Sequence, residues 1–530
     1  MPFDLNSYPY PSQRRVILGK NCAVSTSQPL ATLAGIEMFQ LGGNAVDAAV
    51  ATAITLTVVE PTSNGIGSDA FALVWDGKLQ GLNGSGKSPQ NLSLDAYSSF
   101  KEMPQLGWLT VTVPGAVSAW YQLWKRWGKL SFKQLFSPAI RYAEKGFPVS
   151  PVTAEIWRRK AAVYLSQKSS EFQPFKNVFF PNNRAPKTGE IWGSLFHAET
   201  LKEIAKTGGE SFYQGNLAQK ISNFSADTGG YLNIADLNNH QPLWVEPIYT
   251  KYKQLEVWEM PPNTQGIATL MALNILEGLN LESYPRDSIE SFHYQIEAMK
   301  LAFADVYCHV SDPDYMRVSK EQLLDKIYAK QRQNLITSQA ISLANPGIPQ
   351  GGTVYLCTAD QDLMVSFIQS NYDGFGSGIL IPETGIALHN RGSGFTLETG
   401  HPNQIAPNKR PFHTIIPGFL TQDHQPLGPF GVMGGPMQPQ GHTQMVVNLT
   451  DYQMNPQAAL DAPRWQFLEG NRVLLERGVP SEIVAGLRQR GHEIQLSPET
   501  MFGKGQIILK NEGVFIAASE PRADGLALAY

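Results

Sequence analysis

The sequence predicts an α/β protein, and three observations support this fold class. Helical patterns dominate residues 30–170, with strand-like runs between them. From Thr353 onward the pattern changes to short strands joined in hairpins. Hydrophobic residues make up 42% of the 530 positions and charged residues 17%, so the chain can bury a large core.

The clearest helix of the first half covers residues 45–59, "AVDAAVATAITLTVV". Asn44 is placed to cap its first turn, Asp47 lies near the positive end of its dipole, and Pro61 follows its last turn. The segment is shorter than the roughly 18 to 20 apolar residues that cross a bilayer. We therefore expect a buried helix and no membrane partner.

Further helices and a strand are expected around this segment. A helix that stops at Gly42 precedes it, and the strand-like run "AFALVWDG" at 70–77 follows it. Residues 288–307 predict a second long helix, because apolar side chains recur at steps of three or four and form one stripe. The stripe consists of Ile289, Phe292, Ile296, Met299, Phe303 and Val306.

Two hairpins are predicted after residue 352. The first covers residues 353–370 with a turn at "QD", and the second pairs residues 414–420 with 429–435 around "TQDHQPLG". We expect both hairpins to feed one sheet. The remaining elements are expected to be covering helices at 443–452 and 480–491 and a third hairpin at 505–519.

Composition and charge exclude several partners. Lys and Arg total 42 against 46 Asp and Glu, so there is no positive excess to bind a nucleic acid. Cys22, Cys308 and Cys357 are too few for a disulfide framework or a zinc motif, which is consistent with a reducing compartment. The first residues lack the apolar core of a secretory signal. We expect a cytoplasmic protein.

Neither a metal-hydrolase motif nor a nucleophile elbow is present. The ten histidines form no H-E-x-x-H pattern, and none pairs with a cysteine at ligand spacing. The segments "NGSGK", "GFGSGI" and "NRGSGF" all miss the register of a G-x-S-x-G nucleophile elbow. The sequence therefore predicts neither a metal hydrolase nor a serine hydrolase of that type.

The segment "GLNGSGKS" at residues 81–88 matches the phosphate-binding loop pattern in full. In such a loop a helix begins at the lysine, here Lys87, so that backbone amides point at phosphates. Pro89 disfavours a helical conformation for Ser88. Nucleotide binding stays open as an alternative function.

Thr353 follows Gly351 and Gly352 at the start of the first hairpin. A threonine hydroxyl needs an adjacent base, and its own α-amine serves if the chain is cut before it. Glycines suit such a cut because they permit the twisted backbone that the attack requires. A plain turn entering an edge strand is the alternative. Cys357 lies on the same strand face and is expected to be a buried, inert thiol.

Ten segments along the chain resemble, in order, motifs of the gamma-glutamyltransferase family within the N-terminal-nucleophile hydrolases. Each segment is weak by itself, and the ordered set is specific. They are "GGNAVDAAVA" at 42, "TVPGAV" at 112, "MPPNTQG" at 260, "EAMKLAFAD" at 297, "GGTVY" at 351, "FGSGI" at 375, "PNKRP" at 407, "GVMGG" at 431, "APRW" at 462 and "EPRADG" at 520.

The resemblance implies a four-layer αββα sandwich and a precursor that cuts itself between Gly352 and Thr353. The products, residues 1–352 and 353–530, would form a heterodimer with one shared core, and a higher oligomer stays open. Thr353 would be the nucleophile and its amine the base. The backbone amides of Gly434 and Gly435 would form the oxyanion hole. The implied substrates are γ-glutamyl compounds such as glutathione, with no cofactor.

The expected substrate-binding residues depart from the family pattern. The family's arginine position falls at Ser85, and Arg391 stands where the family has an acidic residue. His413 and Thr414 replace two serines, and Asn371 completes the expected set. The partner for a substrate ammonium is therefore missing.

Three functions follow from these departures. One is a gamma-glutamyltransferase or hydrolase with altered contacts, another is an acylase for glutaryl or other carboxylate-bearing amides, and the third is a processed but inactive binding protein. If Arg391 lies at the site, an acyl group that carries only a carboxylate fits at least as well as γ-glutamyl. The alternative is that Arg391 faces solvent and another acidic residue replaces the missing one.

Overall fold

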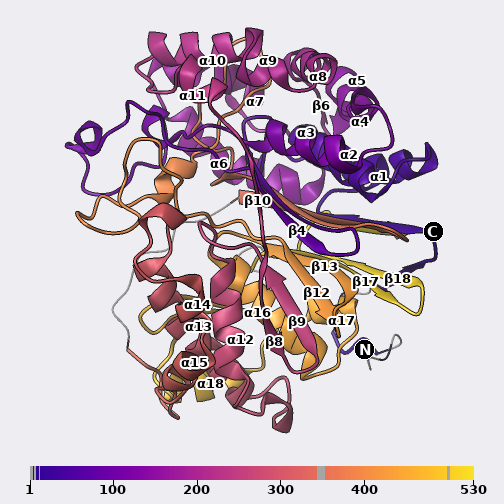
Figure 1. The fold of residues 1–530 in the computed structure, drawn as a ribbon, viewed down its shortest axis with the longest axis vertical. Helices are drawn as coiled ribbons and strands as arrows, with labels where there is room; N and C mark the ends of the chain where they lie inside the picture. The colour runs from indigo at the N-terminus through magenta and orange to yellow at the C-terminus, as the bar shows by residue number, and fades with distance from the viewer. Residues whose placement is uncertain (1–3, 5–6, 11, 13, 343–351, 498–501) are drawn as a thin grey trace.

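The computed structural model describes residues 4, 7–10, 12, 14–342, 352–497 and 502–530. Two seven-stranded antiparallel sheets face each other, and helices cover the outer face of each sheet (Figure 1). The layers therefore have the order αββα. This confirms the expected four-layer sandwich.

Strands from both sides of residue 353 form each sheet. Sheet I consists, in spatial order, of β19 (Leu526–Ala529), β2 (Cys22–Thr26), β10 (Gly352–Asp360), β11 (Met364–Tyr372), β3 (Asp69–Trp75), β4 (Leu79–Asn83) and β7 (Leu243–Val245). Sheet II consists of β1 (Ile17–Gly19), β18 (Val514–Ser519), β17 (Lys504–Asn511), β13 (Gln425–Met433), β12 (Gly418–Gln422), β9 (Leu255–Glu259) and β8 (Ile248–Tyr252).

The helices divide between the two outer layers (Figure 1). Those on the side of sheet I are α1 (Pro29–Gln40), α2 (Ala45–Val59), α3 (Ala116–Trp127), α4 (Phe132–Leu135), α5 (Ser137–Lys145), α6 (Pro151–Leu165), α7 (Gln173–Phe179), α8 (Leu195–Thr207), α9 (Glu210–Tyr213), α10 (Asn216–Asp227) and α11 (Ile234–Asn238). Those on the side of sheet II are α12 (Gly266–Leu276), α13 (Ile289–His309), α14 (Lys320–Leu323), α15 (Lys326–Gln333), α16 (Met437–Thr450), α17 (Pro456–Asp461) and α18 (Ser481–Gln489).

Two small sheets complete the fold. The larger contains β14 (Trp465–Glu469), β15 (Arg472–Glu476) and β16 (Glu493–Ser497), and the smaller contains β5 (Phe147–Pro148) and β6 (Ile191–Trp192).

Helix α2 is the buried helix that the sequence predicts. Asn44 and Asp47 form a reciprocal capping box at its start, and all of its residues are buried. Its first turn is fixed to the far end of β10, because Asp360 accepts a hydrogen bond from Ala45 N at 2.6 Å and Thr358 donates one to Ala45 O at 2.7 Å. The helix therefore holds the strand that carries Thr353.

The apolar stripe of α13 is confirmed, since five of its six members are buried in the core next to sheet II. The first hairpin, β10–β11, is confirmed as well. The second hairpin has a tighter turn than expected, because Asp423 and His424 adopt left-handed φ values of 49° and 59° and the strands extend to them. The expectation of one common sheet is wrong: β10–β11 lies in sheet I and β12–β13 in sheet II.

An apolar core lies between the two sheets. Tyr355 and Cys357 from β10 pack there with Phe419 from β12 and Ile508 from β17. Burial raises the pKa of the Cys357 thiol well above its usual value. This supports the interpretation of Cys357 as an inert thiol.

A buried ion network fixes the start of β17. Glu520 accepts from Arg464 Nη2 at 2.8 Å, from Arg522 Nη1 at 2.7 Å and from Gly505 N at 2.6 Å. Arg522 also pairs with Glu476 on β15 at 2.5 Å. Burial acts to raise the pKa of Glu520, but the two arginines outweigh it and hold the pKa below its usual value. The carboxylate is therefore charged at neutral pH.

We predict that Glu520→Gln lowers the free energy of unfolding by about 3 to 5 kcal/mol, because it leaves buried guanidinium groups without their carboxylate. Thermal melting at neutral pH measures this. The wild-type advantage is present above the unfolded-state pKa of the carboxyl and is lost as the pH falls through the depressed folded-state pKa. The control Glu512→Gln, in the exposed β17–β18 turn, should leave the melting temperature unchanged. Equal melting of both variants contradicts the prediction.

Candidate active site

Thr353 lies at an irregularity near the start of β10. The pairing of β10 with β11 shifts register between Gly352 and Val354, so Thr353 bulges out of the regular ladder. A Cβ at position 352 would lie 2.7 Å from Gly374 N, which explains why glycine precedes the threonine. The Thr353 side chain is buried. Gly351 lies outside the described residues.

The Ser370 hydroxyl on β11 connects the groups around Thr353. Ser370 Oγ lies 3.0 Å from Thr353 Oγ1 and donates to the carbonyl oxygen of Gly352 at 2.8 Å. It accepts from Tyr372 N at 2.8 Å and has Arg391 Nη2 at 3.4 Å. The hydroxyl of the predicted nucleophile and the carbonyl of the predicted cleavage site therefore share one hydrogen-bonding partner.

Arg391 is fully buried, so the alternative that it faces solvent is wrong. Its Nη1 donates to Thr414 Oγ1 at 2.8 Å, and its guanidinium lies 4.3 Å from the ring centre of Tyr372. Burial lowers the pKa of Arg391 to about 10. Tyr372 has a left-handed φ of 77°, an unusual conformation for a bulky residue. Arg391 lies beside Ser370 and behind the Tyr372 ring, where it contacts no solvent.

The negative charge near the Arg391 guanidinium comes from a buried aspartate that contacts two histidines. Asp69, the first residue of β3, lies 3.0 Å from His413 Nε2 and 3.5 Å from His389 Nε2. Burial lowers the pKa of His413 to about 3, so this imidazole is neutral. Burial acts to raise the pKa of Asp69, but the two histidines hold it below its usual value. His413 is therefore a structural contact of Asp69 with no exposed surface.

Gln265 joins the segment of Thr414 to the glycine turn. Its side-chain amide donates to the carbonyl oxygens of Thr414 and Gly435, the latter at 2.9 Å. The backbone N–H of Gln265 also donates to His413 O at 2.9 Å. These contacts bring the predicted oxyanion turn next to Thr414.

Gly434 and Gly435 lie between β13 and the N-terminus of α16, with φ values of 135° and 59°. Both angles favour glycine. Neither N–H donates a hydrogen bond to another described residue. Both donors therefore have no acceptor within the described part of the chain, and the helix N-terminus beside them favours negative charge.

Asn371 and Ser85, like Arg391 and His413, line neither of the two cavities described below. Asn371 is buried and accepts from Ser68 Oγ at 2.7 Å. Ser85 is buried and donates to Asn83 Oδ1 at 2.7 Å. The contacts of Asn371 and Ser85 are to the protein itself.

The phosphate-loop interpretation of residues 81–88 is wrong. No helix begins at Lys87, since the chain is irregular between β4 and residue 90. A Cβ at Gly86 would lie 1.8 Å from Val113 O, so this glycine permits close packing of two loops. Ser88 Oγ donates to Ala406 O at 2.5 Å. No residue of the segment lines either of the two cavities described below.

Two cavities flank the Thr353 region and share Asp373 and Pro436 in their walls. The first, the Thr414 cavity, has a volume of about 950 Å³. The second, the Lys504 cavity, has a volume of about 610 Å³ and is lined by Gly352 and Gly434 among others. Gly352 of the predicted cleavage site and Gly434 of the oxyanion turn therefore lie on the wall of the second cavity, and Thr414 lies on the wall of the first.

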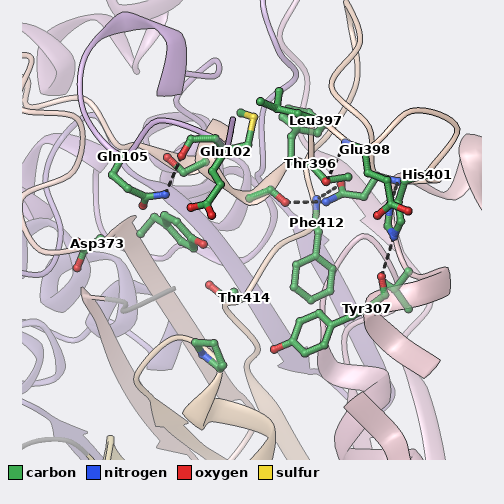
Figure 2. Close-up of a pocket in the computed structure, with 18 of the residues that line it drawn as sticks. Glu102, Gln105, Tyr307, Asp373, Thr396, Leu397, Glu398, His401, Phe412 and Thr414 are labelled. Atoms are coloured by element: carbon green, nitrogen blue, oxygen red, sulfur yellow. Dashed lines mark hydrogen bonds between the residues drawn. The ribbon is translucent and has the colours of Figure 1, made fainter. Parts of the chain in front are cut away.

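Acidic side chains dominate the charge of the Thr414 cavity (Figure 2). It is lined by the carboxylates of Glu102, Asp373 and Glu398 and by the lysine Lys101. Figure 2 shows the Glu102 carboxylate projecting into the space above Thr414. These carboxylates were not identifiable from the sequence as part of the site.

One buried group of potential metal ligands occurs among the described residues. His293, Glu297 and His492 bring their ligand atoms within 4.8 Å of one another. The His293 and His492 rings hydrogen-bond to each other at 2.9 Å, and Lys300 Nζ lies 2.7 Å from Glu297 Oε1. These contacts account for the cluster without a metal. Within the described ranges, no helix has both the length and the apolarity needed to cross a membrane.

Sequence reasoning missed Ser370, Asp69 and Gln265. Ser370 stands one residue before Asn371 in the first hairpin. The bulge that brings Ser370 and Thr353 together has no signal in the sequence. Gln265 belongs to the "MPPNTQG" segment, so the resemblance included it without giving it a role.

Comparison with known proteins gives the family. The family model described as gamma-glutamyltranspeptidase matches residues 31–530. The glutathione hydrolase-like YwrD proenzyme of Bacillus subtilis is 34% identical over 527 residues, which cover 97% of this chain and 99% of the relative. The oxamate amidohydrolase proenzyme of Klebsiella pneumoniae is 30% identical over 518 residues, 94% of this chain and 97% of the relative.

Among solved structures, the cephalosporin acylase from Bacillus halodurans superposes with a TM-score of 0.95 and 52% identity, covering 100% of this chain and 99% of that chain. The gamma-glutamyltranspeptidase of Helicobacter pylori has a TM-score of 0.55 and 29% identity over 59% of this chain and 90% of that chain. This chain therefore belongs to the gamma-glutamyltranspeptidase family and is an enzyme of the N-terminal-nucleophile hydrolase class.

Proposed function

We propose that this protein is an autoprocessed amide hydrolase or acyltransferase that forms an acyl-enzyme on Thr353 and acts on γ-glutamyl compounds such as glutathione. The observation that carries the proposal is the placement of Thr353 Oγ1 and Gly352 O on the same hydroxyl, that of Ser370. The relatives named as proenzymes support the self-cleavage.

Self-cleavage begins with attack of Thr353 Oγ on the carbonyl carbon of Gly352. The C–N bond breaks as the C–O bond forms, so the Gly352 acyl group moves to oxygen and the nitrogen becomes a free amine. Water then hydrolyses the ester. Ser370 donates to the carbonyl oxygen that takes negative charge, which lowers the barrier to attack. The products are residues 1–352 and 353–530, which stay together because strands of both form each sheet.

Loss of Gly352 from the hydrogen-bond network prepares the mature site. A serine hydroxyl has one hydrogen and two lone pairs, so Ser370 cannot serve all four of its neighbours at full strength. Once Gly352 O is released, the Ser370 hydrogen is free to bind Thr353 Oγ1. The same serine then orients the nucleophile.

In turnover, the new α-amine of Thr353 takes the hydroxyl proton as Oγ attacks the amide carbon of the substrate. The developing oxyanion is stabilised by the N–H groups of Gly434 and Gly435, each contributing about 3 to 4 kcal/mol. The proton passes to the leaving amine. Water hydrolyses the acyl-enzyme, or an acceptor amine takes the acyl group.

The Thr414 cavity favours γ-glutamyl as the acyl group. Glu102 and Glu398 offer carboxylates to the substrate ammonium, for which the sequence showed no acidic partner. Asp373, which pairs with Lys160 at 2.8 Å, adds negative charge to the same cavity. Thr414 presents a hydroxyl held by the buried guanidinium of Arg391, which suits the substrate carboxylate. The second candidate is an acylase for glutaryl or similar amides, favoured by the positive charge of Arg391 and by the similarity to a cephalosporin acylase.

We predict that purified wild-type protein runs as two chains, with Thr353 as the N-terminus of the shorter one. Thr353→Ala should remain a single chain, because no hydroxyl is left to attack Gly352. Denaturing gels with N-terminal sequencing make the measurement. Thr353→Ser keeps a hydroxyl and should still be cut. An intact single chain in active wild-type protein would contradict the mechanism.

Ser370→Ala is expected to slow self-cleavage and to lower kcat of the processed fraction by about tenfold or more, since one transition-state hydrogen bond of roughly 1.4 kcal/mol is lost. Time courses of cutting and steady-state kinetics measure the two effects. Ser370→Thr should recover part of both. Ser366→Ala, on the same strand but bonded to Tyr355, serves as the control. Equal rates for the Ser366 and Ser370 variants contradict the role of Ser370.

The acyl preference is tested with γ-glutamyl and glutaryl amides of the same leaving amine. We expect the γ-glutamyl amide to have a kcat/KM higher by about tenfold, a difference of 1.4 kcal/mol, because its ammonium meets carboxylates in the Thr414 cavity. A higher kcat/KM for the glutaryl amide assigns the second candidate function. Cleavage of neither amide refutes both.

A further inference from the structure

The Lys504 cavity has features of a binding site, and the proposed chemistry assigns no ligand to it. It is lined by Gly352 and Gly434, and it meets the Thr414 cavity at Asp373 and Pro436. Its volume of about 610 Å³ is sufficient for a small organic group. Any substrate amide at Thr353 therefore has two cavities into which its two halves can extend.

Lys504 is a buried ammonium in the wall of this cavity. It begins β17 and lies directly opposite Met433, the residue before Gly434, in the pairing of β13 with β17. Only 6% of Lys504 is exposed. Its Nζ makes no hydrogen bond within the part of the chain that the structure describes, and Glu60 Oε1 at 3.8 Å is its ion-pair contact.

The Glu60 carboxylate is a weak counter-ion for Lys504. At 3.8 Å the two groups are too far apart for a hydrogen bond. Glu60 Oε2 instead accepts from Ser27 Oγ at 2.5 Å, and burial raises the pKa of Glu60. A charged ammonium that is nearly buried without hydrogen bonds is costly unless a ligand satisfies it. The cavity is the open side on which such a ligand can bind.

The two cavities carry opposite charge. The Lys504 cavity is lined by four cationic side chains, Arg159, Lys160, Arg472 and Lys504, against the carboxylates of Asp373 and Glu469. The Thr414 cavity has the reverse balance, with Glu102, Asp373 and Glu398 against Lys101.

Three of these cations already have partners. Arg159 pairs with Glu155 at 2.8 Å. Lys160 pairs with Asp373 at 2.8 Å and Arg472 with Glu469 at 2.6 Å. Lys504 is therefore the cation of this cavity whose ammonium has no hydrogen-bonding partner among the described residues. Apolar walls from Ile156, Val163, Leu468 and Leu474 surround it, which suits a ligand with an apolar body and an anionic end.

We propose that the Lys504 cavity binds the amine half of the substrate amide and that Lys504 recognises a carboxylate on that half. This assignment of the two substrate halves to the two cavities rests on the proposed acyl-transfer function. It follows from charge, because the acidic cavity suits the acyl group with its ammonium. The basic cavity suits the anionic leaving group or acceptor. Amines that carry a carboxylate, such as amino acids and peptides, are the class selected.

The test uses two γ-glutamyl anilides, para-nitroanilide and the same compound with a carboxylate on the aniline ring. Wild-type enzyme should have a kcat/KM for the carboxylated anilide that is higher by about tenfold or more. Lys504→Met keeps the length of the side chain and removes its charge, and it should bring the ratio of the two kcat/KM values close to one. Lys510→Met, the same change on the same strand outside both cavities, should leave the ratio unchanged.

Other outcomes overturn the proposal in distinguishable ways. A wild-type ratio near one, or a ratio that Lys504→Met does not change, refutes carboxylate recognition. If Lys504→Met instead lowers kcat/KM for glutaryl relative to butyryl amides, Lys504 binds the acyl half. If no amide is cleaved, the proposed function fails, and ligand binding then tests the site by itself. Aminonitrobenzoate should raise the melting temperature of wild-type protein more than nitroaniline does. Lys504→Met should abolish that difference. No such difference in wild-type protein refutes the site.

Discussion

Four groups meet at the Ser370 hydroxyl, and the arrangement of the active site depends on this meeting point. Thr353 Oγ1, Gly352 O, Tyr372 N and Arg391 Nη2 all lie within 3.4 Å of Ser370 Oγ. They can do so because the register shift at residue 353 turns the threonine out of the regular ladder. A regular strand would place the Gly352 carbonyl in the ladder between β10 and β11 instead.

Burying a guanidinium beside this hydroxyl requires compensation elsewhere in the fold. Arg391 has no contacting carboxylate among the described residues, and its hydrogen bonds go to Thr414 and Ser370. The nearby negative charge is Asp69, held between His389 and His413. The interactions with these histidines hold the pKa of Asp69 below its usual value, so the aspartate stays charged without solvent. The site therefore combines a fixed positive charge near Thr353 with a fixed negative charge behind Arg391.

The sequence predicts the local parts of this structure well. The capped helix at residues 45–59, the stripe of α13 and the β10–β11 hairpin depend on neighbours within a few residues, where periodicity and capping are informative. The ordered motifs identify the family and through it the αββα layers. Thr353 was singled out by the glycines before it, and the structure explains Gly352 by its approach to Gly374.

The contacts that complete the site are long-range and have no local pattern. Asp69 and His413 are 344 residues apart in sequence, and Gln265 and Thr414 are 149 apart. Residues 81–88 show the opposite failure, since a matching string there reflects the close packing of Gly86 on Val113 and no phosphate site. Arg391 Nη2 lies 3.4 Å from Ser370 Oγ, but the burial of this arginine behind Tyr372 could only come from the packed structure.

The central claim is that the hydroxyl of Thr353 carries the acyl group. The most direct measurement is peptide mass spectrometry of active enzyme that has been treated with a γ-glutamyl electrophile or acid-quenched during turnover of a slow amide. The account predicts one added acyl group per molecule, located on the peptide whose first residue is Thr353 and absent from the Thr353→Ala protein. An adduct on Cys357 or on any other residue, or full activity with no adduct at Thr353, would contradict it.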